Sequence, residues 1–381
     1  MKHPIRRFIA ATIAGAAFAA AAQTGPVKIA GIMELSGSGA TPGTNFNNGA
    51  KLAAKEINAA GGILGRQIDY QPVDTQTNPA VAKALAQKAV DDGAYVVLGP
   101  IHSGSALVAM SVMQDAEVPE ITGGEAASIT EKGNPYIFRS SFTQAITMPK
   151  VARYLKDYVK AKTVAMVYSN NDNGKGGRDY FVKALDAAGI KLVADIPTEP
   201  QQVDFSAAAL KAKQSGADAL FLYTLEEESA RMIRELRKQG YDKPIVGESQ
   251  SLSNKTLELA GDAANGLVGH VGMSIDAPDP HIQAFAAKYR KEYGTDSDQN
   301  GMKGYITMYV VKAMTEKIGK FDSKALAKAM HGAQISAAQN PGVLMDIGFD
   351  KNGDIVRGSY LVKIENGKQV VTGALPAVEA K

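Results

Sequence analysis

The sequence contains no cysteine in its 381 residues. Disulfide bonds, thiolate metal sites and thiol nucleophiles are therefore excluded, and a chain of this size must be stabilised by its core alone. Histidine is almost as scarce. The five histidines lie far apart, and none forms the i, i+4 pair with which a helix binds a metal. We expect no metal and no cofactor.

An excess of charge and long apolar runs are also lacking. The 42 Lys and Arg residues nearly balance the 39 Asp and Glu residues, a balance that is not typical of a nucleic-acid-binding surface. After the N-terminal segment, no apolar stretch is long enough to span a bilayer. No G-x-S-x-G motif is present, and we interpret the acidic run 226–228 as the start of a helix. We expect neither an enzyme nor a nucleic-acid partner.

The N-terminal segment has the three parts of a secretory signal peptide. Lys2, Arg6 and Arg7 form a positive start, a short apolar run covers 8–18, and small residues follow at 20–22. This pattern predicts a signal peptide over residues 1–22, cleaved near Ala22, and a periplasmic location. No cysteine follows that would carry a lipid. The alternative is the frayed N-terminal helix of a cytosolic protein.

Along the rest of the chain, short runs rich in β-branched residues alternate with runs of helical spacing. Two such series follow one another. This alternation indicates an α/β fold in which parallel sheets carry helices on both faces. Asn-Gly pairs at 352–353 and 366–367 predict turns between the C-terminal strands. The expected strands are 27–32, 67–73, 95–98, 118–122, 163–168, 192–196, 219–223 and 244–247. The expected helices are 47–60, 78–92, 103–116, 178–188, 205–214, 228–239, 281–293, 302–318 and 323–331.

Three loops that follow strands are candidates for the rim of a ligand site, because ligands bind outside the carboxyl ends of parallel strands. The Gly-rich loop 36–43 has the spacing G-x-G-x-x-x-G, one residue too long for a dinucleotide fingerprint. The loop 99–105 places Ser103 near a helix N-cap, where a hydroxyl and free N–H groups can hold a carboxylate or simply cap the helix. In the loop 122–128, Glu125 is either a solvated charge or an acceptor for a ligand ammonium group.

The order of these segments resembles the type I periplasmic solute-binding proteins of ABC importers, in the leucine/isoleucine/valine-binding group. Two blocks are specific, A-K-E-I-N-A-A-G-G-I at 54–63 and E-L-A-G-D-A-A-N-G at 258–266. The resemblance implies two Rossmann-like doubly wound lobes joined by a three-crossover hinge that closes around the ligand. Lobe 1 would comprise residues 25–142 plus 272–356, and lobe 2 residues 143–271 plus 357–381. Weaker matches lie at 35–37, 74–76, 99–103 and 171–174.

The resemblance also implies how an α-amino acid would be held. Ser103 matches the serine that binds the ligand carboxylate, and Ile101 matches a neighbouring wall position. Gly124 falls where a backbone carbonyl accepts from the ligand ammonium, and Glu248 lies at or one place from the ammonium-binding acid. Charged hydrogen bonds of this kind are about twice as strong as neutral ones.

Several positions depart from the branched-chain pattern. Pro42 and Asn173 stand where aromatic residues are expected, and Ala126 replaces a threonine. Leu225 aligns with an expected tyrosine, although Tyr223 is close by. These departures leave open a polar amino acid or another small carboxylate as the ligand, with Asn173 and Glu125 as polar contacts.

The sequence therefore predicts a monomeric periplasmic protein that captures an amino acid or small carboxylate and delivers it to an ABC permease. One alternative is a periplasmic sensor that presents the bound ligand to a receptor. Another is an amidase or dehydrogenase on a related α/β fold.

Overall fold

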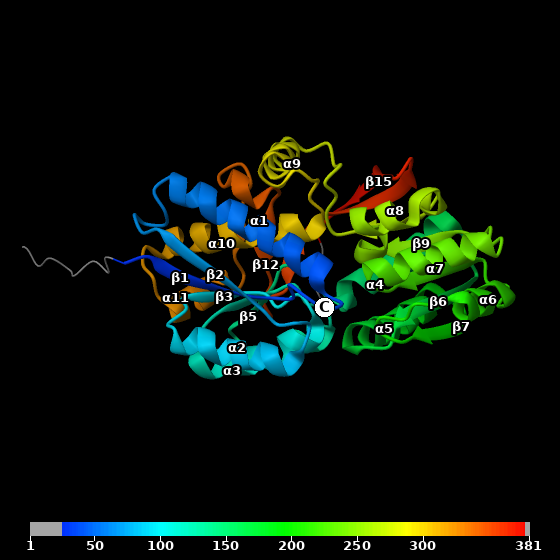
Figure 1. The fold of residues 1–381 in the computed structure, drawn as a ribbon, viewed down its shortest axis with the longest axis horizontal. Helices are drawn as coiled ribbons and strands as arrows, with labels where there is room; N and C mark the ends of the chain where they lie inside the picture. The colour runs from blue at the N-terminus through cyan, green and yellow to red at the C-terminus, as the bar shows by residue number, and fades with distance from the viewer. Residues whose placement is uncertain (1–24, 378–381) are drawn as a thin grey trace, which may run out of the picture.

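The computed structural model describes residues 25–377, so the predicted signal peptide, residues 1–22, lies outside the described range. The described chain forms two α/β lobes that lie side by side (Figure 1). Each lobe is built around its own sheet, as the alternation of strand and helix patterns predicts. The α/β fold class is confirmed. No helix within residues 25–377 is long and apolar enough to cross a membrane.

The first lobe has a five-stranded parallel sheet in the order β2-β1-β3-β4-β5. A small antiparallel sheet, β11-β12-β13, belongs to the same lobe. The strands are β1 (Val27–Met33), β2 (Ile68–Asp74), β3 (Val96–Leu98), β4 (Glu120–Thr122), β5 (Ile137–Arg139), β11 (Gln334–Ile335), β12 (Ile347–Phe349) and β13 (Ile355–Arg357). The helices are α1 (Ala40–Ala59), α2 (Pro79–Asp91), α3 (Ser103–Ala116), α9 (Pro280–Tyr293), α10 (Gln299–Ile318) and α11 (Ser323–Met330).

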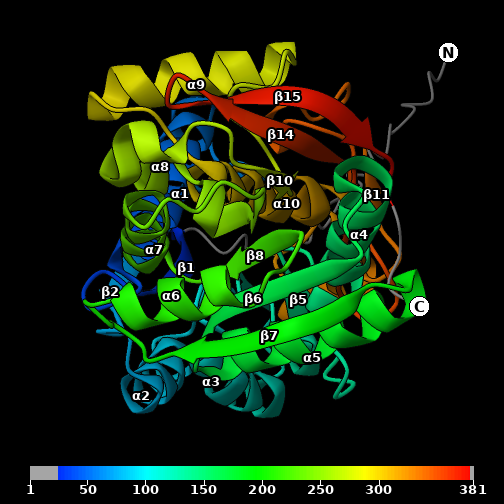
Figure 2. The ribbon, with the colours of Figure 1, turned by 90° about the vertical axis from the view of Figure 1, so that its right-hand side faces the viewer.

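The second lobe has a seven-stranded sheet in the order β15-β14-β10-β9-β8-β6-β7, in which β14 and β15 run antiparallel to their neighbours (Figure 2). The strands are β6 (Thr163–Ser169), β7 (Lys191–Thr198), β8 (Ala219–Tyr223), β9 (Ile245–Glu248), β10 (Val268–Val271), β14 (Ser359–Glu365) and β15 (Lys368–Leu375). The helices are α4 (Gln144–Tyr154), α5 (Asp172–Ala188), α6 (Ser206–Gln214), α7 (Glu226–Lys238) and α8 (Asn254–Ala260).

The chain passes from one sheet to the other three times. The crossings lie between β5 and α4, between β10 and α9, and at Gly358 between β13 and β14. Each lobe is therefore assembled from segments that are far apart in the sequence. The carboxyl ends of β3 and β4 in one sheet face those of β6, β8 and β9 in the other, and this arrangement positions the site.

Helix α10 is buried on nearly all sides because it packs closely on α1. A Cβ atom at Gly49 would lie 1.9 Å from the Gly301 carbonyl oxygen, and one at Gly304 would lie 1.9 Å from the Phe46 carbonyl oxygen. Glycine is required at both positions, since no larger side chain fits between the two backbones. The N-terminus of α10 is capped by Asp298, whose Oδ1 accepts from the N–H of Asn300 at 2.8 Å. This packing fixes where the first turn of α10 points.

The two Asn-Gly turns differ in length. Glu365 pairs directly with Lys368, and both Asn366 and Gly367 have positive φ, so the β14–β15 connection is the predicted two-residue hairpin. The β12–β13 connection instead has five residues, 350–354. Asp350 Oδ1 accepts there from the N–H of Asn352 at 2.8 Å and of Asp354 at 2.9 Å, and these bonds stabilise the wider loop.

Two helices begin six or seven residues earlier than the sequence predicts. α1 starts at Ala40, so Pro42 lies in its first turn and not in a loop. Proline is tolerated there because the first N–H groups of a helix have no partner within the helix. α5 starts at Asp172, so Asn173 is also helical, and Asn171 caps the helix through a 2.8 Å bond from the N–H of Gly174.

Candidate functional site

A cavity of about 150 Å³ lies between the two lobes. An apolar cavity of roughly this volume holds a benzene-sized molecule, so the space suits a small organic ligand. The loops that follow β3 and β4 in the first lobe and β6, β8 and β9 in the second contribute lining residues, as expected for α/β sheets. The lining residues are Pro79, Ile101, His102, Ser103, Gly104, Gly123, Glu125, Asn300 and Lys303 from the first lobe, and Asn171, Asp172, Asn173, Leu225 and Gln250 from the second.

Ser103 lies at the start of α3 and lines the cavity. Of the two roles that the sequence allows for it, helix capping is not observed. His102 holds the N-cap position, and the Ser103 hydroxyl oxygen accepts instead from the N–H groups of Glu125 and Ala126, both at 3.1 Å. The hydroxyl proton is therefore available to donate to a ligand. The first N–H groups of α3 have no acceptor within the helix, so this corner of the cavity favours an anion.

Ile101 also lines the cavity, but its N–H donates to Oε2 of the buried Glu34 at 2.9 Å. Gly124 and Ala126 do not line the cavity; their carbonyl oxygens accept from Arg139, at 2.5 Å and 3.2 Å. A Cβ atom at Gly124 would come within 3.2 Å of the Ser103 Cα atom. Gly124 thus allows the two rim loops of the first lobe to pack together.

Asn173 and Tyr223 belong to the second lobe and meet at Gln144. The amide of Gln144 donates to the Tyr223 hydroxyl at 3.1 Å and to Asn173 Oδ1 at 3.0 Å. The Tyr223 hydroxyl is 3.3 Å from Glu125 Oε2 and so contacts the opposite lobe. Asn173 lines the cavity, whereas Tyr223 lies behind Glu125.

Glu125 lies at the boundary between the lobes, with 13% of its side chain exposed. Its Oε1 is 3.8 Å from the ammonium of Lys303, and its Oε2 accepts from Tyr223. Burial, reinforced by the nearby Glu248 carboxyl, raises the pKa of Glu125 to about 7, although Lys303 opposes the shift. A solvated surface charge, one of the two interpretations of this residue, is therefore excluded.

Glu248 ends β9 in the second lobe and is only 4% exposed. Its carboxylate accepts a very short hydrogen bond from the Ser249 hydroxyl and another from the N–H of Ser251. Burial raises the pKa of Glu248 to about 7, with the Ser249 bond and the Lys303 charge opposing. His270 Nδ1 lies 3.8 Å from Glu248 Oε1, and burial holds the pKa of His270 well below its usual value.

Nothing in the sequence singles out Lys303. It lies near the start of α10, is 4% exposed, and lines the cavity next to Glu125, whereas the predicted ligand residue Glu248 does not line the cavity. Burial lowers the pKa of Lys303, and the charge of Glu125 opposes this shift without reversing it. The only signal was its position among apolar and small residues in a predicted helix, which does not distinguish it from many surface lysines.

Arg357 is a second buried cation that sequence reasoning missed. It lies at the third crossing, donates to the Gly272 carbonyl of the second crossing, and stacks 4.3 Å from the ring centre of Phe142 in the first. Burial lowers the pKa of Arg357 to about 10. The nearby carboxyls of Glu125 and Glu248 oppose this shift, and the charge of Arg357 helps to lower the pKa of Lys303. No group of carboxylates and histidines within residues 25–377 could hold a metal ion.

The chain was compared with known proteins. Residues 26–369 match the family described as periplasmic binding protein. The leucine-, isoleucine-, valine-, threonine-, and alanine-binding protein of Pseudomonas aeruginosa is 27% identical over 359 residues, which cover 94% of each chain.

Two solved structures are similar over nearly their whole length. One is a branched-chain amino acid transporter substrate binding protein from Streptococcus pneumoniae in complex with isoleucine, with 27% identity and a TM-score of 0.83 over 93% of this chain and 99% of that one. The other is an ABC transporter solute binding protein from Rhodopseudomonas palustris in complex with 3,4-dihydroxybenzoic acid, with 27% identity and a TM-score of 0.84 over 93% and 98%.

The resemblance predicted from the sequence blocks is thereby confirmed, together with the two-lobed architecture of this class of protein. The chain belongs to the periplasmic binding protein family, and its role is that of a substrate-binding protein.

Proposed function

We propose that this protein captures a small amino acid or carboxylate between its lobes and delivers it to the membrane permease of an ABC importer. The observation that carries the proposal is the cavity enclosed by both lobes, with Ser103 and the start of α3 offering donors at one end. The two similar solved structures support a small carboxylate, since one contains isoleucine and the other 3,4-dihydroxybenzoic acid. No chemical step is part of this function, and we propose that the protein acts as a monomer.

We further propose that residues 25–142 plus 272–356 and residues 143–271 plus 357–381 are the two lobes that open and close. Polar contacts between the two lobes, outside the cavity lining, support this division. The Thr41 hydroxyl donates to Glu227 Oε1 at 3.0 Å, and the Asn254 amide donates to the Ser297 carbonyl at 2.9 Å. Such polar contacts can break and re-form when a hinged protein opens.

The family supports a periplasmic location. Cleavage of residues 1–22 near Ala22 belongs to the same proposal. N-terminal sequencing of protein secreted to the periplasm tests it: the expected new N-terminus is close to Gln23, and an uncleaved or cytosolic product would contradict it.

Calorimetric titration with a panel of amino acids and small carboxylates tests ligand capture. At least one compound is expected to bind with a Kd of about 10 μM or tighter. Ser103→Ala should weaken that binding at least about tenfold, because a charge-assisted donor is lost. Ser111→Ala, on the exposed part of the same helix, is the matched control and should change nothing. If no compound bound better than about 1 mM, or if Ser103→Ala had no effect, the proposal would fail.

A further inference from the structure

The groups expected to accept a ligand ammonium already have donors from this chain. The Gly124 carbonyl accepts from Arg139 at 2.5 Å. The Glu248 carboxylate accepts from Ser249 and from the Ser251 N–H. A carbonyl oxygen has two lone pairs, so these bonds alone do not exclude a further donor. The remaining candidate acceptor for a ligand ammonium is Glu125, which lies next to Lys303.

Lys303 brings an ammonium group of the protein to the place where a ligand ammonium would lie. Its Nζ is 3.8 Å from Glu125 Oε1, and its charge also acts on the buried Glu248. The close packing of α1 and α10 through Gly49 and Gly304 holds the helix that carries it. A second ammonium at this position would meet Lys303 at short range in a buried site, where like charges repel strongly.

The ammonium of Lys303 also has unused donor capacity. Among the described residues it makes one hydrogen bond, 3.5 Å long, to Asn300 Oδ1, in addition to the 3.8 Å contact with Glu125. Both distances are long for a group with three N–H donors. A buried cation that is poorly satisfied by the protein favours an anion in the adjoining cavity.

Other carboxyls near Lys303 do not reverse this preference. The Asp298 oxygens accept from the backbone of Asn300 and Gly301 and from the Asn300 amide. Glu226 is fully buried, and burial raises its pKa to about 8, so this carboxyl is mostly neutral at pH 7. Lys303 therefore remains available to a ligand carboxylate.

We propose that the ligand is a carboxylic acid without an α-ammonium group, such as a 2-oxo acid or an aromatic acid, whose carboxylate pairs with Lys303 and with the donors at Ser103 and the start of α3. Lys303 substitutes for the ammonium of an amino acid. This inference rests on the proposed function and narrows its substrate class.

Titration of the wild-type protein with matched pairs tests the proposal without any variant. Suitable pairs are 4-methyl-2-oxopentanoate with leucine and phenylpyruvate with phenylalanine, with benzoate as an additional acid. The acid without the ammonium should bind at least about tenfold tighter than its amino acid partner in at least one pair. Tighter binding of the amino acids would overturn this inference and leave ligand capture standing. Binding of no compound would overturn both.

Lys303→Met tests the assigned residue. Binding of the favoured acid should weaken at least about tenfold, and the ratio of acid to amino acid affinity should fall, since Glu125 becomes available to a ligand ammonium. Lys312→Met is the matched control, because Lys312 lies on the same helix but pairs with Glu316 at the surface. An unchanged ratio in Lys303→Met would overturn the assignment. Lys303→Gln, with a polar side chain, provides the same readout if the methionine variant does not fold.

The sign of proton exchange on binding is a second readout in the wild-type protein. Glu125, with a pKa of about 7, faces Lys303 on α10, Glu248 on β9, Tyr223 on β8 and Arg139 on β5. A bound anion raises the pKa of Glu125, so the protein takes up protons at pH 7, whereas a bound ammonium would release them. Calorimetry in two buffers with different ionisation heats measures this sign. Proton release would contradict the proposal.

Discussion

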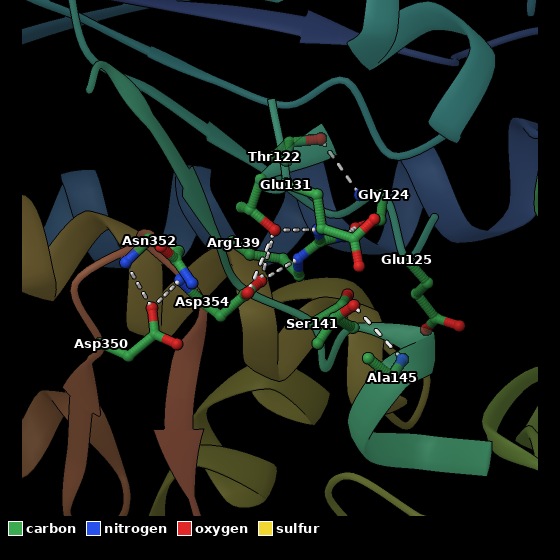
Figure 3. Close-up of polar contacts among 12 residues, drawn as sticks. Thr122, Gly124, Glu125, Glu131, Arg139, Ser141, Ala145, Asp350, Asn352 and Asp354 are labelled. Carbon is green, nitrogen blue, oxygen red and sulfur yellow. Dashed lines mark hydrogen bonds and ion pairs between the residues drawn. The ribbon is translucent and has the colours of Figure 1, made fainter. Parts of the chain in front are cut away.

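Two arginines are among the largest fully buried side chains of this protein, and they are satisfied to very different degrees. Arg139 donates to Asp354 at 2.6 Å, to Thr130 at 2.8 Å and to the carbonyl oxygens of Gly124 and Ala126 (Figure 3). Arg357 donates to the Gly272 carbonyl, makes a 3.5 Å contact with the Gly358 carbonyl and stacks on the face of Phe142. Its Nε and Nη2 have no hydrogen-bond partner among the described residues.

The difference follows the location of the two side chains. Arg139 and its partners all belong to the first lobe, where they tie the rim loop that carries Glu125 to the loop between β12 and β13. Arg357 touches all three crossings between the sheets. Arg139, inside a lobe, is fully paired, whereas Arg357, at the joint between the lobes, is left partly unpaired. Arg139 therefore stabilises its lobe, and Arg357 contributes less where motion is proposed.

Arg139→Met should have the largest effect on stability. It leaves Asp354 buried without its counter-ion, which typically lowers the free energy of unfolding by roughly 3–5 kcal/mol. Denaturant unfolding measures the loss. The double variant Arg139→Met/Asp354→Leu should recover part of it, because the uncompensated carboxylate is then removed. A loss below about 1 kcal/mol would show that the network is not a structural support.

Arg357→Met should lower the free energy of unfolding less, by about 1–2 kcal/mol, since it removes few hydrogen bonds and one stacking contact. The same unfolding experiment applies. If Arg357→Met were as damaging as Arg139→Met, the contrast between lobe and joint would be wrong.

Glu226→Gln extends the comparison to a buried acid whose two oxygens have no partner among the described residues. Its folded pKa of about 8 lies above the unfolded value, so the folded state holds the proton longer and stability falls as pH rises from about 4.5 to 8. The variant should therefore be more stable than wild type at pH 8.5, by at least about 1 kcal/mol, since each unit of a pKa shift corresponds to about 1.4 kcal/mol, and similar to it at pH 4. Glu258→Gln, at an exposed position, is the control. Equal effects at both pH values would contradict the prediction.

The smallest effect is expected for a surface ion pair. Lys55 and Glu292 are 2.7 Å apart, but Lys55 is 65% exposed. Lys55→Met should change the free energy of unfolding by less than about 1 kcal/mol, because solvent screens the pair. A larger loss in thermal unfolding would show that ion-pair distance matters more than burial.

Much of the fold was predictable from local sequence. The helix at 103–116 and the strand at 219–223 were predicted with the bounds that the structure has. The starts of α1 and α5 were predicted too late because both contain glycines. A Cβ atom at Gly43 would lie 2.0 Å from the Glu34 carbonyl oxygen, and one at Gly174 would lie 1.8 Å from that of Ser169. These turns are helical because of close tertiary packing, which helix propensity does not reflect.

The sequence by itself determined the family, the alternation of strands and helices, and two rim loops that bring Ile101, Ser103 and Glu125 to one cavity, whereas the predicted rim loop 36–43 does not line it. Strand patterns and capping signals are local, so they can be read from neighbouring residues. Only the tertiary structure decided which charges meet. Lys303 lies 178 positions along the chain from Glu125, and Arg357 reaches the joint through the last crossing. The partner of a buried charge depends on how distant segments pack, and no local pattern records it.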